Sequence, residues 1–184
     1  MVAGPMDYTP GAMSNAHGPL SYHGADPEYQ DFAPRFDRPM SQTTRAHQIA
    51  LLTVFESPLQ MMADTPTQYQ RENESTTFMA KVPSVWDETI ALHGKIGDYL
   101  AVARRSAEQW FVGAINDENA RTLKLDLAFL PVNKKYQITI IQDGINADHW
   151  AEDYKKITMT VTSKNVLDMN MAPAGGFSAR ITPL

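Results

Sequence analysis

Three polar side chains lie where two short apolar segments end, and each of them could contact a ligand. Asp7 and Tyr8 follow the segment Val2–Met6, and Asp64 follows the segment Leu59–Ala63. If both segments are parallel strands, the three side chains lie at the carboxyl ends of the strands, where barrel enzymes hold their substrates. A carboxylate there can accept hydrogen bonds from ligand hydroxyl groups, and a tyrosine ring can stack on a ligand. The structural alternatives are an Asx turn for Asp7, packing for Tyr8 and a helix cap for Asp64.

The sequence gives little support for a metal site. Because the chain has no cysteine, thiolate ligands, thiol nucleophiles and disulfides are excluded. The histidines His17, His23 and His47 lack the i, i+4 spacing of a zinc pair on a helix. An acidic cluster further on lacks the alternating ligands, central glycine and closing glutamate of a calcium loop. We expect its members to form a solvated acidic loop: Asp143, Asp148, Glu152 and Asp153.

The elements that must position the three candidates centre on the segment Thr43–Pro66. Apolar residues from Thr44 to Phe55 cover nearly the whole circumference of a helix, so this helix expects protein around it. A connection through Pro58 leads into Leu59–Ala63, an apolar run typical of a parallel strand covered on both faces. A further helix begins near Thr65 or Thr67, carries a polar middle on its outer side and ends before Pro83. Between these elements and the first segment, Ala12–Met40 is predicted to be a long loop.

After Pro83 the hydrophobic period changes to two. Leu123, Leu125, Leu127 and Phe129 alternate with polar or small residues, as expected of a half-buried strand. Similar patterns predict strands at 99–105, 110–115, 136–140, 157–161, 166–171 and 177–181. Seven or eight short strands indicate an antiparallel β-sandwich, in which Trp86, Trp110 and Trp150 are more typical of packing than of a carbohydrate-binding platform. We place a domain boundary at Pro83, which gives domains 1–83 and 84–184.

The first part contains only two βα units, which cannot close a parallel sheet by themselves. Two such units directly before a sandwich suit the end of a (β/α)8 barrel followed by an accessory domain. The predicted fold class is therefore α/β plus all-β: the last two βα units of a barrel, followed by an antiparallel β-sandwich.

The net charge and the lengths of the apolar runs argue against some classes of protein. The chain has 184 residues and a net charge of −5, which argues against a nucleic-acid partner. No apolar run approaches the roughly 20 residues that span a bilayer. The segment after Met1 has neither the basic region nor the apolar core of a signal peptide.

Several long strings carry a resemblance that covers nearly the whole chain in order and spacing. They are VAGPMDYTPGAM (2–13), TRAHQIALLTVFESPLQMMADTP (44–66), VPSVWDET (82–89), GKIGDYLAVARR (94–105), DGINADHWAEDY (143–154) and APAGGFSARI (172–181). In these strings the chain resembles glycoside hydrolase family 97. The resemblance implies an α-glucosidase or α-galactosidase with an amino-terminal β-sandwich, a central barrel and a carboxyl-terminal sandwich associated with oligomerisation.

The resemblance also implies what this chain lacks. The family's catalytic carboxylates and calcium ligands lie upstream of Met1, so no catalytic or metal-binding residue can be assigned here. Glycoside hydrolysis requires two carboxyl groups about 5–5.5 Å apart for retention or about 6.5–9.5 Å apart for inversion, and both outcomes remain open. Asp7, Tyr8 and Asp64 are then candidates for contact with an α-linked oligosaccharide substrate, in an enzyme that is periplasmic or secreted and uses calcium. The chain alone is expected to be inactive. The alternative is a non-enzymatic sandwich module for oligomerisation or carbohydrate binding.

Overall fold

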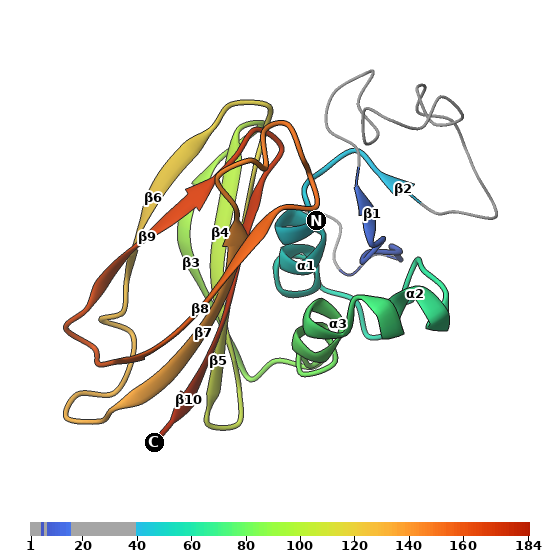
Figure 1. The fold of residues 1–184 in the computed structure, drawn as a ribbon. Helices are drawn as coiled ribbons and strands as arrows, with labels where there is room; N and C mark the ends of the chain where they lie inside the picture. Colours follow the sequence, from blue (N-terminus) through green and yellow to red (C-terminus); the bar gives the residue numbers. More distant parts are fainter. Residues whose placement is uncertain (1–4, 6, 16–39) are drawn as a thin grey trace.

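The computed structural model describes residues 5, 7–15 and 40–184, so the predicted strand Val2–Met6 and most of the predicted loop Ala12–Met40 lie outside the described residues. Within these ranges, antiparallel β-sheets make up most of the structure, with a layer of helices on one side (Figure 1). No helix in the described part of the chain is long and apolar enough to cross a membrane.

The larger of the two main sheets has six antiparallel strands in the order β3-β4-β5-β10-β7-β8. Their bounds are β3 Glu88–Lys95, β4 Tyr99–Ser106, β5 Gln109–Asn116, β10 Gly176–Pro183, β7 Tyr136–Asp143 and β8 Tyr154–Val161. A second sheet pairs β6 (Arg121–Asp126) with β9 (Val166–Met171). The apolar residues of the period-two pattern meet between the two sheets, as a sandwich requires. The core includes Val112, Leu125, Leu127, Ile138, Ile140, Met169, Phe177 and Ile181.

Every strand that the period-two pattern predicts is present, and the hairpin between β4 and β5 is confirmed. Strand β3 was not predicted. It is the edge strand beside β4, most of its residues are exposed or half-buried, and its pairing is irregular between Ala91 and His93. An edge strand with one partner and a bulge loses the strict alternation on which the prediction depends.

Helix α1 (Arg45–Val54) lies against the other face of the six-stranded sheet, as Figure 1 shows. Thr44 caps its first turn by accepting a hydrogen bond from the His47 amide at 3.1 Å. The helix packs directly on backbone: a β-carbon at Gly176 would lie 2.4 Å from the Cα of His47, and one at Gly113 would lie 2.9 Å from the Cβ of Thr53. Only two of its residues are partly exposed, so the prediction of a helix surrounded by protein is confirmed.

Helix α1 shares a second apolar cluster with Met13, with the third helix and with Ile141 of β7. Ile49 and Leu52 of α1 meet Met13, Phe78 and Met79 there. Phe78 and Met79 belong to α3 (Asn73–Met79), which follows α2 (Pro66–Arg71). The single helix predicted from Thr65 is therefore two short helices, which are interrupted at Glu72.

The predicted strand Leu59–Ala63 is wrong for the chain as described. This segment belongs to no sheet, and the backbone hydrogen bond that it makes to the earlier segment runs from the Ala63 amide to the Pro10 carbonyl at 3.0 Å. Leu59 is 69 % exposed and Met61 44 % exposed, whereas a parallel strand covered on both faces would bury them. A strand is defined by its partners, and the described residues supply no ladder on either side of this segment. The short parallel bridge between β1 (Ser14–Asn15) and β2 (Met40–Ser41) lies elsewhere.

Candidate functional site

Tyr8 lies beside the carboxyl end of α1 and is held there by both its ring and its hydroxyl group. The ring packs edge-on against Phe55, with 5.3 Å between centroids. The hydroxyl donates to the Leu51 carbonyl and accepts from the Gln60 side-chain amide, each at 3.1 Å. Burial raises the pKa of Tyr8 to about 12, so the phenol stays neutral and keeps its proton. Packing thus occupies part of the ring, and stacking on a substrate stays a prediction.

Asp64 ties the segment before α2 to residues 10–13. Its Oδ2 accepts from the Met13 amide at 2.9 Å, and its Oδ1 accepts from the Thr65 amide at 2.9 Å. The residue that caps α2 is Thr65, whose hydroxyl accepts from the Gln68 amide, so the capping role considered for Asp64 is wrong.

Tyr69 strengthens the same junction. Its hydroxyl donates to the Gly11 carbonyl at 2.9 Å and accepts from the Asp64 amide at 3.0 Å. Burial raises the pKa of this phenol as well. The structure therefore brings the chain that follows Tyr8 together with the chain around Asp64, and a shared substrate rim stays a prediction. Asp7 is exposed, and its contacts with the other described residues define no role for it.

Arg45, at the start of α1, joins four parts of the chain, and the sequence analysis missed it. Its side chain is buried, with an exposed fraction of 4 %, and it forms ion pairs with Glu72 at 2.7 Å and Glu152 at 3.4 Å. The guanidinium also donates to the Met13 carbonyl and to Asn15 Oδ1. The available signal was a single charged residue at the start of a helix predicted to be surrounded by protein, because a buried guanidinium needs acceptors.

The loop between β7 and β8 is less solvated than predicted. Asp143 is 7 % exposed, and its Oδ2 accepts from the amides of Ala172 at 2.8 Å and Gly176 at 2.9 Å. Burial raises the pKa of Asp143 to about 6 despite these bonds. Glu152 is committed to Arg45, and Asp153 accepts from the Asn146 amide. These three carboxylates hold the loop together, and Asp148 is the one member of the predicted cluster that is exposed, with about half of its side chain (46 %) accessible.

The described residues contain no cluster of side chains arranged as a metal site. No group of three or more His, Asp or Glu side chains in residues 5, 7–15 and 40–184 is arranged to hold a metal ion.

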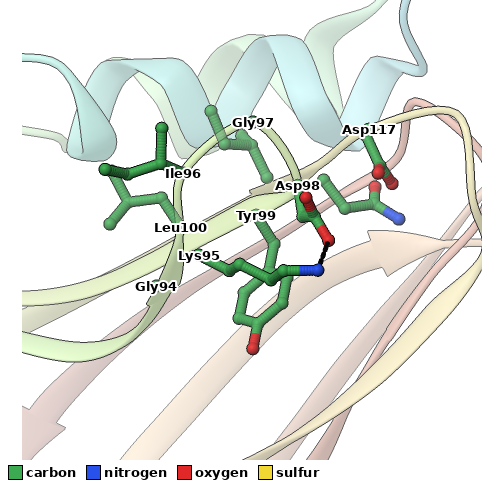
Figure 2. Close-up of a pocket in the computed structure, with 10 residues that line it drawn as sticks. Gly94, Lys95, Ile96, Gly97, Asp98, Tyr99, Leu100 and Asp117 are labelled. Carbon is green, nitrogen blue, oxygen red and sulfur yellow. Dashed lines mark hydrogen bonds and ion pairs between the residues drawn. The ribbon is translucent and has the colours of Figure 1, made fainter.

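A hollow of about 570 Å³ lies at the end of the sandwich beside the turn between β3 and β4 (Figure 2). Lys95 pairs with Asp98 at 2.6 Å, and this hydrogen bond raises the pKa of Lys95. Nearby, Arg121 lies over the Tyr99 ring at 4.5 Å and pairs with Asp117 at 3.4 Å. Among the residues that line the hollow, no nucleophile lies beside a base.

The chain is similar to known proteins along its whole length. Residues 85–182 match the sequence family described as Glycosyl-hydrolase 97 C-terminal, oligomerisation. A retaining alpha-galactosidase from Bacteroides thetaiotaomicron is 44 % identical over 180 residues, which are 98 % of this chain and 25 % of that protein. A probable retaining alpha-galactosidase from Streptomyces bingchenggensis is 26 % identical over 97 % of this chain and 24 % of its own length.

Solved structures of family 97 enzymes are also similar to this chain. A glycoside hydrolase family 97 enzyme from Pseudoalteromonas sp. strain K8, in complex with panose, superposes with a TM-score of 0.84 at 35 % identity. The match covers 100 % of this chain and 27 % of that enzyme. A beta-arabinopyranosidase shares the fold at a TM-score of 0.65 and 24 % identity, over 78 % of this chain and 22 % of its own. The chain thus spans about a quarter of the length of the relatives that it matches.

Proposed function

The chain belongs to glycoside hydrolase family 97, and we propose that it is the carboxyl-terminal portion of a retaining α-galactosidase that acts on oligosaccharides. The observation that supports this proposal best is the 44 % identity to a retaining alpha-galactosidase, which extends over 98 % of the chain. The similarity includes residues 1–83 as well as the sandwich, so it also covers the segments that carry Tyr8 and Asp64.

An α-glucosidase is the second candidate. The Pseudoalteromonas family 97 enzyme is described in complex with panose, an α-linked glucose oligosaccharide, and it is 35 % identical over 100 % of this chain. The two activities differ in the orientation of one sugar hydroxyl group. In this proposal, the residues that distinguish the two orientations lie outside residues 1–184.

In this proposal the chain completes an active site whose catalytic groups lie in the rest of a longer protein. A retaining glycosidase needs a carboxylate nucleophile and a carboxylic acid about 5–5.5 Å apart. In the described residues, the buried Asp143 is held by backbone amides and the partly buried Glu152 by Arg45, which leaves neither carboxylate available for that role. The calcium ion implied by the family would likewise have its ligands elsewhere.

Residues 1–83 supply part of the substrate rim, and residues 84–184 form the accessory domain. Asp7, Tyr8 and Asp64 are the substrate-side residues: Asp64 fixes the backbone of residues 11–13, and Tyr8 presents a neutral phenol beside the same segment. The exposed side chains of Leu59, Met61 and Met62 are then the surface that the remainder of the barrel covers. The sandwich supports assembly into oligomers, and we expect a periplasmic or secreted location.

The test compares this chain with the longer protein on aryl α-galactosides and aryl α-glucosides, in the presence of calcium. We expect the longer protein to turn over the galactoside and the chain alone to turn over neither substrate. Robust hydrolysis by the chain alone would contradict the division of catalytic groups. If the longer protein is also inactive, the alternative of a non-enzymatic sandwich module is favoured.

Two variants of the longer protein test the rim. Tyr8→Phe and Asp64→Asn should raise the KM for the α-galactoside more than they lower kcat, because they alter binding and not bond cleavage. Asp148→Asn, which changes an exposed carboxylate of the β7–β8 loop, is the matched control and should leave both constants unchanged.

A further inference from the structure

We propose that the end of the sandwich formed by the β3–β4 turn, with Ile96 at its centre, is the surface through which two copies of the chain associate. This inference rests on the proposed role of the sandwich in oligomerisation and adds the contact surface. The matched family is described as an oligomerisation domain, but neither that description nor the comparisons assign the contact to any residues.

Ile96 is the most exposed large apolar side chain among those described, with an exposed fraction of 103 %. It lies in a tight turn in which the Asp98 amide donates to the Lys95 carbonyl at 3.0 Å and Gly97 has a φ of +86°. Gly97 is suited to that backbone conformation, and a polar residue at position 96 would fit the turn equally well. The fold itself therefore gives no reason for an isoleucine here, whereas burial in an interface does.

The hollow beside the turn provides the complementary shape. Besides Ile96, its apolar lining is Leu100 and Ile115, which face each other across the β4–β5 pair. Figure 2 shows Ile96 and Leu100 on one side of the turn and the Lys95–Asp98 pair on the other. One surface thus carries both an apolar projection and an apolar hollow. In a twofold dimer each Ile96 can enter the hollow of the other copy, which is the self-complementarity that an isologous interface requires.

The charges around the hollow do not oppose contact with a second copy. The chain as a whole carries a net charge of −5, so two copies repel each other over most of their surfaces. Around the hollow the charges cancel within the copy: Lys95 pairs with Asp98 at 2.6 Å, and Arg121 pairs with Asp117 at 3.4 Å. A rim of internally paired charges around an apolar centre has the composition of a protein–protein interface.

The β3–β4 turn lies at an end of the sheet and not on the face that α1 covers (Figure 1). A different exposed apolar group, Leu59, Met61 and Met62, lies in the segment before α2, where we propose that the rest of the barrel packs. The two apolar surfaces therefore serve different partners.

Sedimentation velocity of the full chain over a range of concentrations tests the proposal. We expect the wild type to associate and Ile96→Glu to raise the dissociation constant at least about tenfold, because a charge would have to enter the apolar hollow. The matched control is Val132→Glu, which changes a side chain that is 72 % exposed in the loop between β6 and β7, at the opposite end of the sheet. This variant should associate like the wild type. Circular dichroism melting curves establish that both variants are folded.

The possible outcomes test two claims separately: that the sandwich mediates oligomerisation, and that the contact lies at the β3–β4 turn. If the wild type associates and folded Ile96→Glu associates equally well, the assignment of the surface is overturned while the oligomerisation role stands. If the wild type is a monomer at all concentrations, both are overturned. Loss of association in Ile96→Glu but not in Val132→Glu supports the proposed surface.

Discussion

The Arg45 guanidinium lies 2.7 Å from the carboxylate of Glu72, and this ion pair connects the helix on the sandwich to the turn between α2 and α3. Because α1 is also packed on β5 and β10, the same helix contacts the sheet on one side and Met13 and α3 on another. The two parts of the chain that differ in sequence pattern thus share one helix. Changes in α1 are therefore expected to affect both parts together.

Replacing Arg45 by methionine tests this connection. The change removes the partner of Glu72 and Glu152 and leaves the Met13 carbonyl without its donor. Loss of one partner of a buried ion pair is strongly destabilising, and since both glutamates are partly exposed we expect a loss of about 2–4 kcal/mol in the free energy of unfolding. Urea unfolding of the chain measures it.

Lys124→Met is the control for Arg45→Met. Lys124 pairs with Asp168 at 2.5 Å on the outer face of the β6–β9 sheet, but its side chain is 68 % exposed. An exposed pair contributes about 0–1 kcal/mol. Equal effects of the two variants would show that Arg45 is no more than a surface charge.

A methyl group at Gly176 should separate α1 from the sheet. The new β-carbon would lie 2.4 Å from the Cα of His47 and 2.5 Å from its amide nitrogen, and backbone atoms cannot move aside as a flexible side chain can. Overpacking of this kind costs about 1–3 kcal/mol, which thermal unfolding of Gly176→Ala would detect. Gly94→Ala, whose β-carbon would meet Leu100 at an ordinary 3.6 Å, should be neutral. A wild-type melting temperature for Gly176→Ala would mean that the helix does not pack this closely.

The sandwich could be predicted from the sequence because its strands carry their pattern locally. Residues such as Leu123 and Leu125 point into the core at every second position, whatever the neighbouring strand is. The segment Leu59–Ala63 shows the limit of this reasoning. Its apolar run indicates a covered strand, but covering requires partners that the described residues do not include, and here the segment is irregular.

The candidate site was only partly predictable for a similar reason. Tyr8 and Asp64 could be chosen because each follows an apolar run. The importance of Arg45 depends on Glu72 and Glu152, and these carboxylates are distant from it in the sequence. The sequence places Asp143 in a solvated acidic loop because its cluster lacks the pattern of a calcium loop, whereas in the structure its carboxylate accepts from the amides of Ala172 and Gly176, around the start of β10. Long-range pairing of polar groups leaves no periodic signal in the sequence.

Removal of calcium should affect only the longer protein. Since no acidic or histidine cluster in the described residues is arranged to hold a metal ion, dialysis of the chain against EDTA is expected to leave its unfolding midpoint unchanged. The same treatment of the longer protein should lower its glycosidase activity, and added calcium should restore it. A calcium-dependent rise in the melting temperature of the chain itself would place a ligand set within residues 1–184.

The pH dependence of stability should contain two opposing contributions at the junction of α1 and β10. The first comes from His47, whose ring Nδ1 lies 3.0 Å from the Gly175 carbonyl. Burial lowers the pKa of His47 to about 4, so the folded state binds fewer protons than the unfolded state between pH 4 and 6.5. This contribution to stability is present above the unfolded pKa and is lost as the pH falls through 4. The second comes from Asp143, with a pKa of about 6. It acts in the opposite direction, because its stabilising contribution is present below the unfolded value and is lost as the pH rises through 6.

Single substitutions should separate these two contributions. In Asp143→Asn only the histidine remains, so the free energy of unfolding should rise with pH between about 4 and 6.5, by at most about 1.4 kcal/mol per pH unit. In His47→Gln only the aspartate remains, so the free energy of unfolding should fall with pH between about 4 and 6. Urea unfolding at half-unit pH steps measures both slopes, and in the wild type the two should partly cancel. Slopes of the same sign in the two variants would contradict the assignment, because each variant retains the group whose effect the other removes.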